Sequence, residues 1–170
     1  ADREDAARRL AAQLRPLSLV HPLVLAIPRG GVVIGAVLAR ELGADLDVVL
    51  ARKLRAPYQP ELALGAVGED GELYLNRSVV SALGVSKSSL EHERRHQLDE
   101  IARRQALYRA IRPQAPLSGR SLILTDDGIA TGSTMIAALH YVRGHDPREV
   151  IVAVPVAPPE RLEAIQPLCD

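Results

Sequence analysis

The sequence predicts an α/β protein with a doubly wound, mostly parallel sheet that carries an inserted hairpin and a long helix. Two well-separated segments are each patterned as strand, helix and strand, the unit from which parallel sheets are built. The segment between them has a different composition, and about residues 70–115 are expected to form an insertion. A length of 170 residues suits one continuous core, so we expect a single domain over residues 1–170.

The first part of the chain predicts a helix followed by one strand–helix–strand unit. Residues 2–14 carry apolar side chains at helical spacing among charges, which indicates an amphipathic helix. The apolar segments 22–27 and 46–50 predict strands, and the largely apolar segment 31–42 predicts the helix between them. Parallel pairing of these strands, with a right-handed crossover, is the expected arrangement.

The second unit comprises a strand at 121–125, a helix at 133–143 and a strand at 150–155, with Gly144 capping the helix. In a doubly wound sheet, ligands bind beyond the carboxyl ends of the strands. The turn after the first strand of each unit is therefore where we expect a binding site.

The region between the units predicts three further features. Segments 61–67 and 72–75 could pair as a hairpin. A charged helix from about 88 to 111 follows, and it ends before Pro113. Residues 52–60 contain three cations and two prolines, which predict an irregular, partly mobile loop.

Composition excludes several classes of protein. The formal net charge is zero, which argues against a nonspecific nucleic-acid or anionic-membrane surface. The single cysteine, Cys169, excludes an internal disulfide framework and is compatible with a reducing, cytoplasmic location. No apolar run could span a bilayer, and the charged N-terminus has no signal-peptide pattern. The absence of an initiator Met and the end at Asp170 indicate a trimmed or partial chain, and a missing C-terminal tail and a homo-oligomer both stay open.

Residues 122–134, Leu-Ile-Leu-Thr-Asp-Asp-Gly-Ile-Ala-Thr-Gly-Ser-Thr, are the most informative segment. The two aspartates follow a buried strand and can accept hydrogen bonds from hydroxyl groups. The amides of residues 130–134 lie at a helix N-terminus, which favours an anion, and the glycines allow a close approach of backbone to ligand. A phosphorylated sugar satisfies both halves. Neither a Walker A loop nor a G-x-G-x-x-G motif is present, and a plain strand–helix turn with solvated aspartates is the alternative.

This segment resembles the substrate loop of type I phosphoribosyltransferases, which hold 5-phosphoribosyl 1-diphosphate (PRPP). The similarity covers about residues 20–158 and is close to small bacterial members of unassigned substrate. The resemblance implies that the two aspartates hold the ribose hydroxyls and that the loop cradles the 5′-phosphate. The PRPP-binding residues implied here are Asp126, Asp127, Gly128, Ile129, Ala130, Thr131, Gly132, Ser133 and Thr134.

A second loop, at residues 26–31, follows the first strand. Gly30 and Gly31 permit close anion approach, and Arg29 is a planar cation suited to phosphate. In the resembled family this loop binds the pyrophosphate of PRPP, sometimes through a strained or cis non-proline peptide. A helix N-terminus with a surface arginine is the alternative interpretation.

Lys53, one of only two lysines in the chain, lies in the basic segment 52–60. The resemblance implies that this segment is a catalytic loop that closes over PRPP. Lys53 would stabilise the departing pyrophosphate, and Arg55 is a lesser candidate. A solvated basic loop is the alternative.

The implied reaction transfers a 5-phosphoribosyl group from PRPP to a nitrogenous base and releases pyrophosphate. Arg29, Lys53 and Asp127 are the expected catalytic residues, and Mg²⁺, held mainly by PRPP, is the expected cofactor. PRPP and a small-molecule base are the expected partners, with neither nucleic acid nor membrane. A regulator that binds PRPP without turnover is the competing function, and a closing lid around Lys53 would distinguish the two.

The acceptor base is not specified by the sequence. The 6-oxopurine transferases have an Asp before the Thr-Gly of the loop, whereas this chain has Ala130, which argues against hypoxanthine or guanine or moves proton transfer elsewhere. The segments that could form a hood over the base are 1–20, 70–115 and the C-terminal tail. Without Phe or Trp, the only aromatic residues near the expected site loops are Tyr58 and Tyr74.

His92-Glu-Arg-Arg-His96 matches the H-E-x-x-H zinc motif, but we reject a metal site there. Helical spacing places both histidines opposite the apolar face that should pack inward. A catalytic zinc needs a third ligand and a shaped cavity, which a solvated face does not offer. The apolar face predicted to pack inward comprises Leu90, Leu98, Ile101 and Tyr108.

Overall fold

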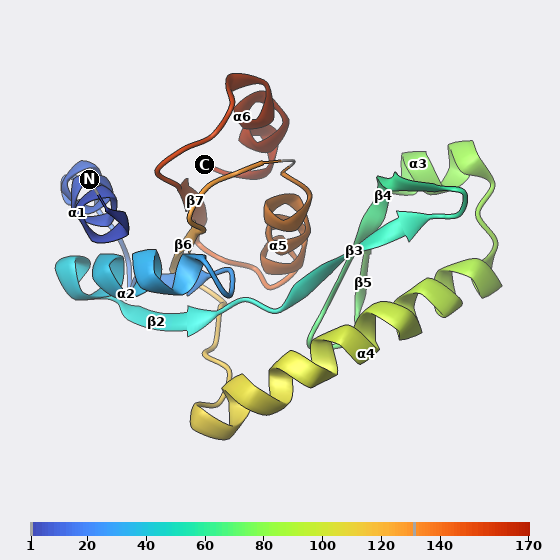
Figure 1. Cartoon of the computed structure of the whole chain (residues 1–170), viewed down its shortest axis with the longest axis horizontal. Helices are drawn as coiled ribbons and strands as arrows, with labels where there is room; N and C mark the ends of the chain where they lie inside the picture. Colours follow the sequence, from blue (N-terminus) through green and yellow to red (C-terminus); the bar gives the residue numbers. More distant parts are fainter. Residues whose placement is uncertain (1, 131) are drawn as a thin grey trace.

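A computed structural model describes residues 2–130 and 132–170. Its central sheet has four parallel strands in the order β2-β1-β6-β7. The order reverses between β1 and β6, which are neighbours in the sheet but belong to different strand–helix–strand units. Figure 1 shows the whole chain, with β2, β6 and β7 of this sheet labelled. This confirms the α/β class and the mostly parallel sheet. The strands are β1 (Leu23–Ala26), β2 (Asp45–Val48), β6 (Ser121–Thr125) and β7 (Glu149–Ala153).

Helices cover both faces of this sheet because successive strand residues point to opposite sides. Val24 and Ile123 belong to the cluster packed with α1 (Arg3–Leu14) and α2 (Gly31–Leu42). Leu25 and Leu124 pack instead with α5 (Ser133–Arg143). With no Phe or Trp, aliphatic side chains and Tyr141 fill these interiors. The chain ends in α6 (Pro159–Ile165) and a short 3₁₀ turn (Gln166–Leu168) against the α5 side.

The region between the two units, residues 51–111, is called the inserted region below. It forms a second, antiparallel sheet of three strands with the order β3-β4-β5. The predicted hairpin is confirmed, since β4 and β5 pair antiparallel, and so is the long helix, α4. Ile101 of α4 is buried against this sheet, with Leu90, Leu98 and Tyr108 packed around it, as the helical spacing predicted. The elements are β3 (Ala51–Ala56), β4 (Gln59–Gly68), β5 (Leu73–Leu75), α3 (Arg77–Leu83) and α4 (Lys87–Ile111).

The prediction of an irregular loop over residues 52–60 is wrong. Residues 51–56 are strand β3 and residues 59–68 are strand β4, joined by a tight turn. The reason lies in the alternation of side chains along β3, where Leu54 and Ala56 are buried while Arg55 is exposed. The turn is made by Pro57 and Tyr58, whose φ is +62°. Pro60 is tolerated in a strand because it lies near the exposed end of the hairpin.

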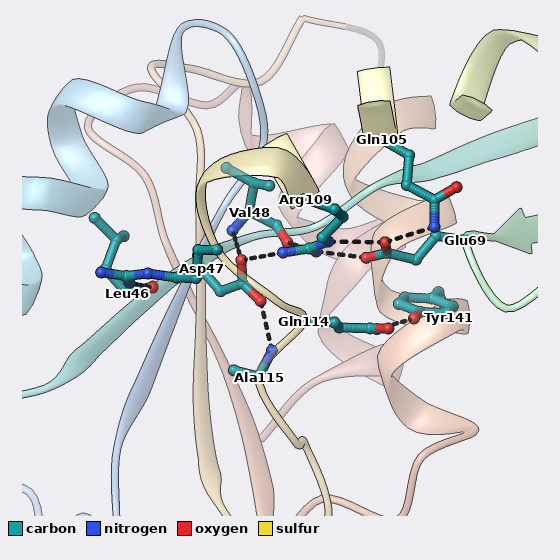
Figure 2. A network of polar contacts seen from close by, with 10 residues as sticks. Leu46, Asp47, Val48, Glu69, Gln105, Arg109, Gln114, Ala115 and Tyr141 are labelled. Carbon is teal, nitrogen blue, oxygen red and sulfur yellow. Dashed lines mark hydrogen bonds and ion pairs between the residues drawn. The ribbon is translucent and has the colours of Figure 1, made fainter. Parts of the chain in front are cut away.

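Charged residues fasten the inserted region to the parallel sheet (Figure 2). Arg109 of α4 donates to Asp47 at 2.7 Å and to Glu69 at 2.5 Å. The side chains of the two acids are only 4% and 2% exposed. Asp47 also accepts from the backbone N–H groups of Val48 and Ala115. One guanidinium therefore joins β2, the end of β4 and the long helix, and its hydrogen bonds to both acids raise the pKa of Arg109 despite burial.

Replacement of Arg109 by methionine should lower the free energy of unfolding by about 3–5 kcal/mol, because two buried carboxylates lose their cation. Urea unfolding measures this change. Arg103→Met is the matched control on the same helix: its ion pair with Glu100 involves an arginine side chain that is 73% exposed. That variant should lose less than about 1 kcal/mol. Equal losses in the two variants would contradict a structural role for the buried network.

Charged side chains are distributed along most of the length of helix α4. Within the described part of the chain, no helix combines the length and the apolar character needed to cross a membrane.

Candidate active site

Two loops meet at the carboxyl ends of neighbouring parallel strands, where the strand order reverses. Ala26 at the end of β1 lies in register with Thr125 at the end of β6. The backbone N–H of Ile27 donates to the carbonyl of Thr125 at 2.9 Å, which extends the pairing by one residue. The loop before α2 and the loop before α5 therefore start side by side. In open α/β sheets, this reversal point is where ligands bind.

The loop after β1 contains a cis peptide between Pro28 and Arg29. The resemblance to the type I family included such a peptide as one form of this loop. Its two glycines have no room for a side chain. A Cβ on Gly30 would lie 2.4 Å from Oδ2 of Asp127, and a Cβ on Gly31 would lie 2.7 Å from the carbonyl oxygen of Thr125. The glycines thus allow the first loop to lie directly against the aspartate of the second.

On the expectation that these loops hold PRPP, Gly30→Ala should weaken PRPP binding about tenfold or more, because the new methyl group must displace the Asp127 carboxylate. The free energy of unfolding should change much less, since the loop is at the surface. Isothermal titration with PRPP and urea unfolding measure the two quantities. Unaltered PRPP affinity in a folded variant would show that the position of this carboxylate is not critical.

The two aspartates differ in their surroundings. Burial raises the pKa of Asp126 to about 6, and the nearby charge of Asp127 adds to this. A hydrogen bond from the backbone N–H of Asp127 to Oδ1 of Asp126, at 2.8 Å, acts in the opposite direction. Asp126 is therefore mostly ionised at pH 7 and takes up a proton as the pH falls through about 6. Asp127 forms an ion pair with Arg3, 2.9 Å from the guanidinium.

The second loop forms a small cradle of about 160 Å³ at the N-terminus of α5. Gly132, with φ +85°, precedes the first helical residue, Ser133. The backbone N–H of Ile129 donates to the carbonyl of Val156, which holds the loop against the segment after β7. Thr131 lies outside the described residues. The cradle is lined by Asp126, Gly128, Ile129, Ala130, Gly132, Thr134 and Met135.

A larger cavity of about 330 Å³ lies beside the cradle and shares Asp126 and Thr134 with it. Lys53 of β3 lines this cavity, so the structure brings Lys53 and Asp126 to one site. The side chain of Lys53 makes no hydrogen bond or ion pair with any residue in the two described ranges. The other lining residues are Ile27, Pro28, Val49, Leu50, Ala51, Arg52, Arg55, Gln97, Ile101, Arg104, Ser133, Thr134 and Ala138.

The cavity wall contains two arginines that the sequence did not single out. Arg52 is half-buried, and its Nε donates to Oε1 of Gln97 at 3.1 Å. Burial lowers the pKa of Arg52, and the neighbouring charge of Arg104 lowers it further. Apart from Asp126, the lining contributed by residues 2–130 and 132–170 includes no acid. The cavity is thus electropositive, which favours an anionic ligand.

Not every predicted residue reaches the cavity. Arg29 is exposed at the rim and is absent from the lining. Arg55 lines the cavity but is paired with Glu93. Tyr58 is fully exposed at the hairpin turn. Tyr74 packs against Tyr141 and the far end of α5, about 16 Å along the helix from the cradle.

The H-E-x-x-H motif, which the sequence analysis rejected as a zinc site, lies on helix α4. His92 and His96 are both exposed on α4. Over residues 2–130 and 132–170, no group of three or more His, Cys, Asp or Glu side chains could hold a metal ion.

Comparison with known proteins fits this geometry. The sequence matches the phosphoribosyl transferase domain over residues 1–169. The chain belongs to the phosphoribosyl transferase family. Among family members, a protein of Mycobacterium tuberculosis that is provisionally named a phosphoribosyl transferase is 45% identical over 157 residues. That alignment covers 92% of this chain but 35% of the relative, so the chain spans about a third of the curated protein's length.

Solved structures share the fold of this chain. The crystal structure of TT1426 from Thermus thermophilus is 48% identical, with a TM-score of 0.95 over 99% of this chain and 80% of that one. A purine phosphoribosyltransferase from Pyrococcus horikoshii is 15% identical, with a TM-score of 0.54 over 92% of this chain and 74% of that one. The second likeness shows a common fold only.

Proposed function

We propose that this phosphoribosyl transferase domain moves the 5-phosphoribosyl group of PRPP to a nitrogenous base and releases pyrophosphate. The observation that carries the proposal is the junction of its two loops, where the Asp127 carboxylate lies directly against Gly30. A cradle at the N-terminus of α5 lies on one side of this junction, and an electropositive cavity that contains Lys53 lies beside it. PRPP carries a phosphate at one end and a pyrophosphate at the other, so a molecule with two anionic ends fits that succession of surfaces.

Each end of PRPP has a proposed partner. The backbone amides at the start of α5, with Ser133 and Thr134, hold the 5′-phosphate, because a helix N-terminus favours negative charge. Asp126 and Asp127 accept hydrogen bonds from the ribose hydroxyls. Their negative charge also favours the cationic ribose that develops as the bond to pyrophosphate breaks.

The pyrophosphate end is assigned to Arg29 and Lys53. As pyrophosphate departs, it gains negative charge, so a fixed cation stabilises the transition state more than the bound substrate. Arg52 and Arg104 line the same cavity and add to its positive potential. The half-buried position of Lys53 on a strand reduces the side-chain freedom that is lost when it meets the ligand.

Magnesium fits this site as an ion bound chiefly through the substrate. Mg²⁺ commonly takes one or two carboxylates together with phosphate oxygens and water. Asp126 and Asp127 supply carboxylates, and Asp126 is mostly ionised at pH 7. When bound, the ion would neutralise charge on the pyrophosphate, while Arg29 and Lys53 hold that group in place.

The proposal about the acceptor base rests on a carboxylate that is missing from the loop. Ala130 lines the cradle at the position where 6-oxopurine transferases carry an Asp, and Asp126 is the one acid among the described residues of the lining. A base that needs a carboxylate at this position to accept its proton is therefore disfavoured. The adenine and orotate enzymes have loops more like this one.

A PRPP sensor without turnover is the second candidate. One observation favours it: residues 51–56 and 59–68 form a paired hairpin, rather than the loose lid that a closing catalytic loop requires. Against it stands Lys53, a cation without a partner in the described ranges, placed in the cavity where pyrophosphate would leave.

Pyrophosphate release from PRPP and Mg²⁺, measured across a panel of purine and pyrimidine bases, distinguishes the two. Release with one base would support the transferase and identify the acceptor. Silence with every base, combined with PRPP binding by isothermal titration, would support the sensor. Failure to bind PRPP at all would overturn both.

A further inference from the structure

The N-terminal helix contributes a cation to the site, far along the chain from either loop. Nη2 of Arg3 lies 2.9 Å from Oδ2 of Asp127, across 124 positions of sequence. The same oxygen is the atom that leaves no space for a side chain on Gly30. Asp127 is therefore held between Gly30 on one side and the Arg3 guanidinium on another.

The position of Arg3 is not explained by the helix that carries it. Arg3 is the first residue of α1, where the helix dipole disfavours a positive charge. Arg8 and Arg9 of the same helix pair with acids one turn earlier, Glu4 and Asp5. Arg3 has no such partner in its own helix and reaches across to the loop after β6.

The start of α1 is held in place by a helix cap and by buried side chains. The Asp2 side chain accepts from the backbone N–H of Asp5 at 2.9 Å and caps the helix. Ala7, Ala11 and Leu14 are buried against α2 and the central sheet. The guanidinium therefore reaches Asp127 from a docked helix, and not from a free chain end.

This ion pair contributes little to stability. The side chains of Arg3 and Asp127 are 61% and 36% exposed, and pairs with that exposure contribute about 0–1 kcal/mol. Its effect should instead appear at the carboxylate. Asp126 and Asp127 are adjacent acids whose charges repel, and a guanidinium on one of them offsets that repulsion.

We propose that Arg3 is a positioning residue of the PRPP site, which holds the Asp127 carboxylate oriented toward the ribose hydroxyls. The inference rests on the proposed function. It assigns α1 a role in substrate binding in addition to its role in packing. A guanidinium has five N–H donors, so Arg3 can keep its contact with Asp127 while other donors stay in solvent.

PRPP titration of Arg3→Gln tests this, with Arg8→Gln as the matched control on the same helix. Arg3→Gln should bind PRPP about tenfold more weakly and raise the KM for PRPP, with a smaller change in kcat. Arg3→Lys should recover part of the affinity, and Arg8→Gln should match the wild-type chain. All three variants should unfold at the same urea concentration as wild type. A shifted midpoint of urea unfolding with unchanged PRPP affinity would instead indicate a purely structural role for Arg3.

A double-mutant cycle with Asp127→Asn separates positioning from direct contact. If Arg3 acts through Asp127, Arg3→Gln should weaken PRPP binding by less than about twofold in the Asp127→Asn background. A full tenfold loss there would mean that Arg3 touches PRPP itself and would overturn the positioning role. If the wild-type chain binds PRPP and Arg3→Gln binds it equally well, the role of Arg3 is wrong and the proposed function stands. If the wild-type chain does not bind PRPP, the proposed function is wrong as well.

Discussion

Asp127→Asn is expected to lower kcat/KM for pyrophosphate release by at least about 100-fold while the fold persists. The substitution keeps the shape of the side chain but removes its charge. Charged hydrogen bonds to the ribose hydroxyls contribute about 1.5–3 kcal/mol each, and stabilisation of a developing cation is lost as well. Initial rates at varied PRPP measure the loss, and urea unfolding reports on the fold.

Asp99→Asn is the matched control for this substitution. Asp99 is exposed on α4, and the same loss of charge with the same side-chain shape occurs there away from the two loops. Its rate should equal that of the wild-type chain. Similar rates for Asp127→Asn and Asp99→Asn would exclude the assignment of the ribose site to the loop after β6.

Lys53→Ala is expected to lower kcat by about 100-fold to 1,000-fold and to weaken PRPP binding by only about threefold. The asymmetry arises because pyrophosphate carries more charge as it leaves than while it is bound to ribose. Single-turnover rates and isothermal titration give the two quantities separately. A larger effect on binding than on kcat would remove Lys53 from the catalytic role and favour the sensor.

The chain supplies its own control for this experiment. Its one other lysine, Lys87, is exposed at the first position of α4. Lys87→Ala removes an identical side chain and should change neither quantity. A parallel loss in both variants would indicate a general effect of net charge, not a local one at the cavity.

The parallel core could be predicted because its signals are local. Helix α2 spans Gly31–Leu42 and helix α5 spans Ser133–Arg143, the ranges that apolar spacing and glycine placement predicted. The Asp126-Asp127 loop was recognisable for the same reason, since one short segment contains the strand, the acids and the helix start. The binding of PRPP at this loop stays a prediction.

Segment 51–56 was misassigned because its strand pattern is short and surrounded by competing signals. The buried positions Leu54 and Ala56 alternate correctly, but cations and prolines around them are typical of loops. Pairing with β4 decides the structure there, and such pairing is a long-range property.

Contacts between distant residues could not be predicted from one sequence. Arg3 meets Asp127 across 124 positions, and Arg109 meets Asp47 across 62. Nothing in the local pattern distinguishes these arginines from the many others. Only the folded arrangement shows that one reaches the site and that the other anchors the long helix.

Helix α4 divides its duties along its length. Gln97, Ile101 and Arg104 line the cavity, while Arg109, one to two turns further on, is bonded to the central sheet. Substitutions at those three positions can therefore reshape the cavity wall without removing the bonds of Arg109. The helix separates the surface that a ligand would meet from the contacts that hold the helix in place.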